Sequence, residues 1–305
     1  MATTIVYKKG RPSGVRLQEW RDGWLYASPF IIGFLVFWAG PMVYSLYLVV
    51  NDWDMMSPPQ FVGLGNIAHM FQDPLMAQAL GNTAYYTFIG VPLQLMVGFA
   101  LAVALNRKLT GQALYRTIFY LPSIVPAVAN ALVWSQIFNP DFGVLNNLFQ
   151  TVGLPKVNWL FDPRAAKPAF ILMSLWGAGW QMVIFLAGLQ GVPQQLLEAA
   201  EIDGAGPMAR FWNIMVPMIS PTILFNLVVS VIGSFQVFTS SLVMTHGGPQ
   251  NSTLFLVLYT YTNGFNLFKM GYAATLAWAT FLIIMIFTYL QFRLSNRWVY
   301  YETTV

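Results

Sequence analysis

Three carboxylates lie close together in residues 195–205, a stretch without a basic residue. They are Glu198, Glu201 and Asp203. The flanking sequence is strongly apolar, since neither 168–197 nor 211–268 contains an Asp, Glu, Lys or Arg. Carboxylates offer directional, charge-assisted hydrogen bonds to Arg or Lys side chains on another surface. The stretch is therefore a candidate contact site for a partner protein.

The same stretch has the features of a short helix. Pro193 suits the first turn, where its missing N–H is not needed, and Gly204 suits a C-terminal stop. One side of this helix, at spacings of three and four residues, carries Leu196, Ala199, Ala200 and Asp203. Small side chains let another backbone approach closely, and the apolar area is too small for the helix to fold without a docking cleft. The alternative is an ordinary solvated amphipathic helix, which is common on membrane-protein surfaces.

Other chemistry is excluded by residue content. The chain has no cysteine and two histidines, His69 and His246, so we expect no disulfide, thiol nucleophile or metal site. No Gly-Lys dipeptide occurs, which rules out a Walker A phosphate loop. Two G-x-G-x-x-A matches, at 63–68 and 204–209, lack the preceding strand that a dinucleotide site needs. We predict a non-catalytic chain without cofactors and with no nucleic-acid partner; any ATP and Mg would be bound by another chain.

The composition is that of an integral membrane protein. Only 9% of residues are charged and 57% are hydrophobic, whereas a soluble domain has about 25% charged residues. Hydrocarbon offers no water to unpaired backbone groups, so the predicted fold is all-α. Charge-free windows predict six transmembrane helices, at about 26–48, 83–105, 117–137, 169–190, 220–243 and 271–292.

The basic residues predict the orientation of these spans. With six spans, 11 of the 15 basic residues fall on the side of the N-terminus, which predicts that both termini are cytoplasmic. Residues 254–268 are too short for a crossing and are expected on the outer surface as an interfacial segment. We expect an N-terminal cytoplasmic segment (1–25), a transmembrane domain (26–297) with a cytoplasmic loop at 191–219, and a tail (298–305).

The loop at 191–219 contains a motif that resembles a known family. Glu198-Ala199-Ala200, Gly204 after three more residues, and Ile214-Met215-Val216-Pro217 after nine more are similar to the E-A-A-x3-G-x9-I-x-L-P signature. This signature marks permease subunits of binding-protein-dependent ABC importers; the one departure is Val216, where Leu is usual. The Ile-Asp-Gly-Ala continuation at 202–205 resembles the carbohydrate-uptake branch.

Further segments share the resemblance, which covers roughly residues 25–297. They are Phe61-Val62-Gly63-Leu64-Gly65-Asn66, Arg116-Thr117-Ile118-Phe119-Tyr120-Leu121-Pro122, Leu186-Ala187-Gly188-Leu189-Gln190, Ser234-Phe235-Gln236-Val237-Phe238 and Met244-Thr245-His246-Gly247-Gly248-Pro249. The last two are similar to the maltose- and glycerol-phosphate-type permeases. The family often has Asp where this chain has Thr239.

The resemblance implies a division of labour in a bacterial or archaeal cell (inner) membrane. Two permease chains would form the pore, two cytoplasmic ATPases would supply energy, and an extracytoplasmic solute-binding protein would deliver the substrate. Each ATPase would grip one permease through the helix at 194–203, called the coupling helix. Its expected force-transmitting residues are Glu198, Ala199, Ala200, Asp203 and Gly204.

The spans contain no ionisable residue other than tyrosine, which argues against proton or sodium coupling and suits a neutral, hydroxylated solute such as a sugar. Candidate solute contacts are the aromatic, amide and hydroxyl residues Asn130, Trp180, Gln181, Ser234, Phe235, Gln236, Phe238 and Thr239. Each could instead hydrogen-bond or pack between helices. The alternatives are a polyol or glycerol-phosphate-type solute, a stand-alone secondary transporter, which would need inverted repeats and midplane charges, and a membrane-embedded enzyme.

Overall fold

Long apolar helices form most of the computed structural model, which describes residues 14–107 and 110–300. Residues 1–13 of the expected N-terminal segment and residues 301–305 of the expected tail lie outside the described residues. So does Lys108, one of the basic residues in the charge count. Within the described residues, four continuous helical segments are long and apolar enough to cross a membrane: Leu17–Val49, Pro74–Leu105, Ser220–Met244 and Met270–Ser295. Two bent helix pairs, Gln112–Ile124 with Ala127–Ile137 and Pro163–Trp176 with Gly179–Gln190, bring the number to six if each pair is one span.

The first two spans are helices interrupted by π-helical turns. The first consists of α1 (Gly14–Phe34), η1 (Leu35–Ala39) and α2 (Gly40–Val49), and the second of α4 (Pro74–Tyr85), η2 (Tyr86–Gly90) and α5 (Val91–Leu105). Between them lie the strands β1 (Asn51–Asp52) and β2 (Gln60–Phe61), which pair antiparallel, and helix α3 (Gly65–Gln72). The second span begins nine residues before the predicted start, because Asp73 caps it by accepting a hydrogen bond from the backbone N–H of Leu75.

The third and fourth spans are bent rather than straight. α6 (Gln112–Tyr120) and η3 (Leu121–Ile124) meet α7 (Ala127–Ile137) at 98°. Val125 is extended between them because the proline ring of Pro126 disfavours a helical conformation in the residue before it. α8 (Val144–Thr151) follows, and then α9 (Pro163–Trp176) meets α10 (Gly179–Gln190) at 46°.

Gly179 allows α10 to cross the backbone of α6 closely. A Cβ atom added at Gly179 would lie 2.0 Å from the carbonyl oxygen of Phe119, so no larger residue fits without a shift of the backbone. α5 and α10 share a core cluster that contains Met182 and Phe185, both almost fully buried. Helices of the second, third and fourth spans are thereby held together.

The loop at 191–219 and the last apolar helices complete the described part of the chain. Their elements are α11 (Gln194–Ile202), α12 (Pro207–Arg210), η4 (Phe211–Met215), α13 (Val216–Met218), α14 (Ser220–Ser234), α15 (Thr239–Met244), α16 (Leu256–Tyr261), η5 (Thr262–Asn266) and α17 (Met270–Ser295). The fifth span breaks between α14 and α15, where Phe238 leaves the helical conformation.

The prediction of residues 254–268 as an outer interfacial segment was wrong for residues 254–264, which are buried or half-buried, whereas residues 265–268 are exposed. Phe255, Leu256 and Leu258 are at most 2% exposed, so α16 lies inside the protein. The second span supplies partners for the backbone at the start of α16. Thr83 Oγ1 accepts a hydrogen bond from the N–H of Leu256 at 3.1 Å, and Asn82 Nδ2 donates one to the carbonyl of Leu254 at 3.1 Å. An apolar segment too short to cross a membrane can therefore be buried once a neighbouring helix satisfies its polar groups.

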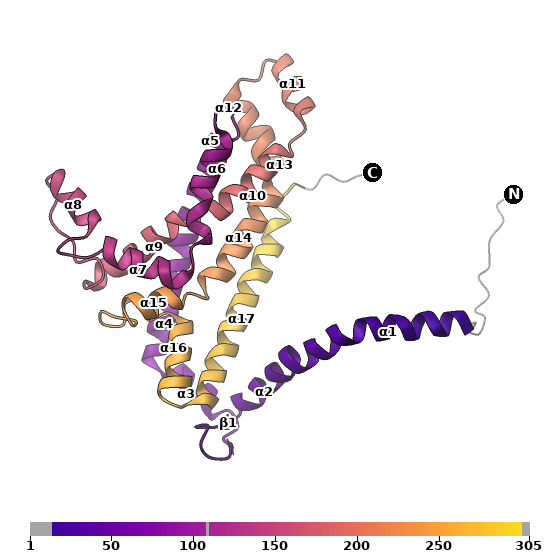
Figure 1. Cartoon of the computed structure of the whole chain (residues 1–305), viewed down its shortest axis with the longest axis vertical. Helices are drawn as coiled ribbons and strands as arrows, with labels where there is room; N and C mark the ends of the chain where they lie inside the picture. Colours follow the sequence, from indigo (N-terminus) through magenta and orange to yellow (C-terminus); the bar gives the residue numbers. More distant parts are fainter. Residues whose placement is uncertain (1–13, 108–109, 301–305) are drawn as a thin grey trace.

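The elements gather at two opposite margins of the molecule (Figure 1). α3 and β1 lie at the lower end, and α8 and the turn between α15 and α16 lie at the left, whereas α11 and α12 lie at the upper end, toward which the C-terminal end of α17 points. α1 extends away from the other helices toward the right.

Candidate functional site

Helix α11 has the start and stop that the sequence predicts. Pro193 occupies the N-cap position and Gln194 begins the helix. Gly204 has a φ of 83°, and the N–H of Ala205 donates to the carbonyl of Ala200 at 2.8 Å. This is the hydrogen bond of a Schellman ending, which requires a left-handed residue and therefore favours glycine.

α11 is exposed along its length. None of its residues is buried, and Ile202 is 87% exposed while Leu196 is 43% exposed. Of the five expected force-transmitting residues, Ala200 is half-buried and Glu198, Ala199, Asp203 and Gly204 are exposed. An exposed helix with two uncovered aliphatic side chains has the surface expected of a docking element.

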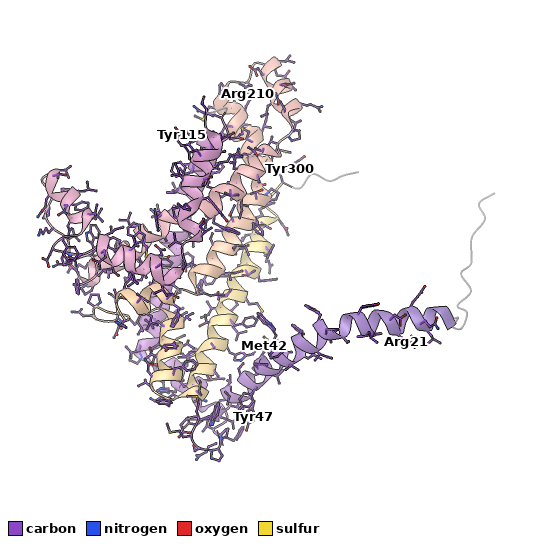
Figure 2. The ribbon with its side chains drawn as sticks, in the orientation of Figure 1. Arg21, Met42, Tyr47, Tyr115, Arg210 and Tyr300 are labelled. Carbon is purple, nitrogen blue, oxygen red and sulfur yellow. The ribbon has the colours of Figure 1, made fainter. Side chains whose placement is uncertain are left out.

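Two polar contacts order the carboxylates of α11. Gln194 Nε2 donates to Glu198 Oε1 at 2.8 Å, one helical turn away. Arg210 on α12 forms an ion pair with Glu201. Figure 2 shows Arg210 at the upper end of the molecule, beneath α11. The ion pair therefore connects α11 to α12 through their side chains, so α12 would feel a displacement of α11.

α12 continues without a gap into the fifth span. η4, α13 and α14 follow it in order, with one residue, Ile219, between the last two helices. Ile219 is 1% exposed and anchors this joint in the core cluster shared with α5 and α10. Because a 15-residue helix is about 22 Å long, α14 reaches from this joint to Ser230 and Ser234, deep in the bundle.

A polar cavity lies beside that end of α14. Its volume is about 270 Å³. The lining residues come from the second, fourth and fifth spans and are all uncharged: Tyr86, Gly90, Val91, Gln94, Ser174, Gln181, Val229, Ser230, Gly233, Ser234 and Val237. Hydroxyl and amide groups in an apolar bundle can exchange hydrogen bonds with a neutral polar solute.

Gln181 is the best-placed polar group in this cavity. Its Nε2 donates to Ser230 Oγ at 3.3 Å, but its buried Oε1 has no hydrogen-bond partner among the described residues. Nearby, Gln94 Nε2 donates to the carbonyl of Ser174 at 3.0 Å, and the hydroxyls of Thr87 and Ser234 lie 2.8 Å apart. A buried acceptor without a partner carries a free-energy penalty that an incoming hydroxyl would relieve.

The cavity brings together two of the eight expected solute contacts, Gln181 and Ser234. Phe235 is instead 1% exposed and packs against Phe287 in the core, with ring centroids 5.5 Å apart. Phe238 stacks near Tyr261 outside the cavity.

The remaining four expected contacts also lie outside the cavity lining. Trp180 and Gln236 are exposed, and Asn130 and Thr239 are half-buried. Trp180 is next to Gln181 in the sequence but lies on another face of α10, because successive residues of a helix point in different directions.

Four polar lining residues were missed by the sequence analysis: Tyr86, Gln94, Ser174 and Ser230. The signal was present in the spacing of one pair. Ser230 and Ser234 lie four residues apart on α14, so they share a helix face.

A second polar cluster joins the helices at the opposite margin. Asp73 accepts hydrogen bonds from the hydroxyls of both Tyr259 on α16 and Tyr272 on α17. Burial raises the pKa of Asp73, but the hydrogen bonds from the two tyrosines and from the Leu75 N–H outweigh it, so the pKa lies below its usual range. His69 stacks on Tyr272 at 4.7 Å between ring centroids. In residues 14–107 and 110–300, no group of three or more His, Cys, Asp or Glu side chains is arranged for a metal ion.

The apolar helices, the polar cavity and the exposed loop helix define a multi-pass membrane transport protein. Residues 94–300 match the family described as "binding-protein-dependent transport system inner membrane component". The chain belongs to this family.

Relatives and solved structures extend this result. The chain is 43% identical over 286 residues to the probable ABC transporter permease protein YesP of Bacillus subtilis, with 92% of each chain covered. It is 36% identical to the lactose transport system permease protein LacF of Rhizobium radiobacter, with 89% and 93% covered. A chain of a bacterial alginate ABC transporter complex has the same fold, with a TM-score of 0.81 at 24% identity and 93% and 98% coverage.

Proposed function

We propose that this chain is a permease subunit of an ATP-driven importer that moves a neutral sugar or oligosaccharide inward. The observation that carries the proposal is the cavity at Gln181, which is polar, uncharged and enclosed by three spans. Relatives whose names include lactose, arabinooligosaccharides and diacetylchitobiose support the substrate class. A glycerol-phosphate-type solute fits less well, because it would bring a negative charge into a cavity without a lining cation.

The proposed topology has six spans with both termini in the cytoplasm. The placement of the elements supports it, since α11 and α12 lie at the upper end of the molecule, toward which the C-terminal end of α17 points, whereas α3 and β1 lie at the lower end (Figure 1). The N–H of Tyr300 also donates to Ser220 Oγ at 2.8 Å, which joins the C-terminal segment to the end of α14 nearest α11. The cytoplasmic loop at 191–219 then faces the ATPases.

The energy enters through α11 in this proposal. Two cytoplasmic ATPases hold ATP and Mg, and each grips one permease; the chain itself catalyses nothing. Glu198, Ala199, Ala200, Asp203 and Gly204 present the exposed docking surface. The ion pair of Arg210 with Glu201 and the continuous path into α14 support the transmission of force toward Ser230 and Ser234.

A second permease subunit completes the pore. The surface of helix α1 is an argument for this second subunit. α1 stands apart from the other helices (Figure 1) and exposes large apolar side chains. Trp24 is 61% exposed and Phe30 is 79% exposed. Lipid covers part of this surface, and the partner permease covers the rest. An extracytoplasmic solute-binding protein delivers the substrate to the margin that carries α3 and α8.

Gln181 and Ser234 are the proposed hydrogen-bonding groups for the solute. Asn130, Trp180, Gln236, Phe238 and Thr239 remain proposed contacts along the path outside the cavity. Phe235 is assigned instead to packing, because its ring is enclosed by the core.

The test is solute-stimulated ATP hydrolysis in the reconstituted complex with its ATPases, second permease and binding protein. A panel of neutral sugars, polyols and phosphorylated solutes should give stimulation by a neutral sugar. Glu198→Ala should assemble and lose that stimulation. Purification of the chain alone in mild detergent, without an ATPase or a second permease, would refute the proposal.

A further inference from the structure

An apolar groove lies at the same end of the molecule as α11, where the second span meets α12 and η4. Its volume is about 480 Å³. The walls are formed by Val103, Met208, Phe211, Trp212 and Met215, and Arg107 stands at its edge. We call it the inner groove. It is separate from the cavity at Gln181, because the two share no lining residue.

The inner groove combines an apolar wall with a cation. Val103 belongs to the apolar second span, and Arg107 follows two residues after its end at Leu105. Arg107 is exposed and takes part in neither of the two ion pairs found among the described residues. Arg107 is the one charged residue in this described lining, so the groove favours an anionic ligand.

The position of the groove selects the kind of ligand. In the proposed topology, the end of the second span lies at the cytoplasmic membrane surface, where anionic lipids gather. Trp212 is 58% exposed in the groove wall, and tryptophan prefers the level of lipid headgroups. A ligand that fits both the apolar wall and the cation has an acyl chain and a negatively charged headgroup.

We infer that the inner groove binds an anionic phospholipid of the cytoplasmic leaflet. The acyl chain lies along Phe211, Trp212 and Met215, and the phosphate pairs with Arg107. Because η4 forms one wall and leads from α12 into α14, the lipid contacts the segment that connects the coupling helix to the cavity. The inference rests on the proposed topology and names a ligand for a different surface.

The experiment uses the complete importer in nanodiscs of phosphatidylcholine with or without phosphatidylglycerol. Native mass spectrometry counts the phosphatidylglycerol that stays bound. Arg107→Gln should retain about fivefold less than the wild type, the ratio that corresponds to about 1 kcal/mol for one basic side chain at an anionic surface. The matched control is Arg293→Gln at the end of α17, which removes a cation outside the groove and should retain the wild-type amount.

Fluorescence gives a second measurement that does not depend on counting lipids. The signal of Trp212 is the difference between the wild type and Trp212→Phe. Brominated phosphatidylglycerol should quench it more strongly than brominated phosphatidylcholine, and Arg107→Gln should abolish that preference. Equal quenching by the two lipids, or equal retention by Arg107→Gln and the wild type, would overturn the inference. Shielding of Trp212 from both lipids would also overturn it and indicate a protein partner on the groove.

The same preparations separate this inference from the proposed function. Solute-stimulated ATP hydrolysis in the wild-type nanodiscs establishes that the importer is intact, whatever the lipid result. Absence of this stimulated hydrolysis would count against the proposed function. The lipid-retention and fluorescence-quenching results would still decide whether the inner groove binds an anionic lipid.

Discussion

Arg210 on α12 forms an ion pair with Glu201 on α11, nine positions earlier in the sequence. The side chain of Arg210 is 22% exposed and that of Glu201 is 66% exposed. The pair therefore lies at the surface, where it adds little to the stability of the fold. It connects the exposed helix α11 to the segment that leads into α14.

Replacing Arg210 with Gln should change the stability of the protein little but weaken its coupling to the ATPases. We expect a loss of less than about 1 kcal/mol in the free energy of unfolding, as for other exposed ion pairs. Solute-stimulated ATP hydrolysis should fall clearly, because α11 would no longer move with α12. The charge-swapped pair Glu201→Arg with Arg210→Glu should recover stimulation. A double variant as defective as Arg210→Gln would contradict this role.

The left-handed conformation of Gly204 predicts which substitutions the protein tolerates at this position. A Cβ atom added there meets nothing within 4 Å, so any effect of substitution comes from the φ of 83°. Asn adopts this conformation readily, whereas a β-branched residue does not. Gly204→Asn should therefore keep most of the stimulated ATP hydrolysis and Gly204→Val should lose it, with both variants present in the membrane. Equal activity of the two variants would show that the α11 ending is not required.

Gln181 and Phe235 should respond differently to substitution. Gln181→Leu removes the unpartnered Oε1 and the donor to Ser230, so we expect the solute concentration for half-maximal transport to rise at least about tenfold. Phe235→Leu should instead lower the thermal stability of the purified complex, since it leaves a gap in the core. Transport assays across solute concentrations, together with melting curves, distinguish these outcomes. An unchanged solute dependence of transport in Gln181→Leu would show that the cavity is not part of the solute path.

Asp73 should make stability depend on pH at the acidic end. Its lowered pKa means that the folded state favours the charged carboxylate. The resulting stabilisation is present above the unfolded value of about 3.9 and is lost as the pH falls through the folded value. The difference in melting temperature between the wild type and Asp73→Asn should therefore shrink below about pH 4. Tyr259→Phe should show a weaker pH dependence than the wild type, and an unchanged dependence would exclude this hydrogen bond as the cause.

Local sequence features predicted much of this structure. Pro193 and Gly204 predicted the limits of α11 to within one residue, because helix caps depend on a few neighbouring residues. Charge-free windows located the apolar helices for a similar reason, since charged residues are costly in hydrocarbon. The bend at Val125 was also encoded, in Pro126, although no bend was predicted there.

The features that were not predicted from the sequence depend on contacts between distant residues. The burial of α16 depends on Asn82 and Thr83, about 170 residues earlier in the chain, and no local pattern in 254–268 reports them. The grouping of Gln94 with Gln181 likewise depends on how the second and fourth spans pack. Residue types alone made Phe235 and Gln236 equal candidates, and only the fold separates a core ring from an exposed amide.

The most direct test of the coupling role uses the absence of cysteine from the sequence. Ala199→Cys places a single thiol on the exposed helix α11, and Thr151→Cys places one on α8 at the opposite margin. A short thiol-to-amine crosslinker is added to the complex assembled with its ATPases. Crosslinking of Cys at position 199 to the ATPase, strengthened by ATP and absent from position 151, is the predicted result. A crosslink from position 151, or none from position 199 in an active complex, would contradict the account.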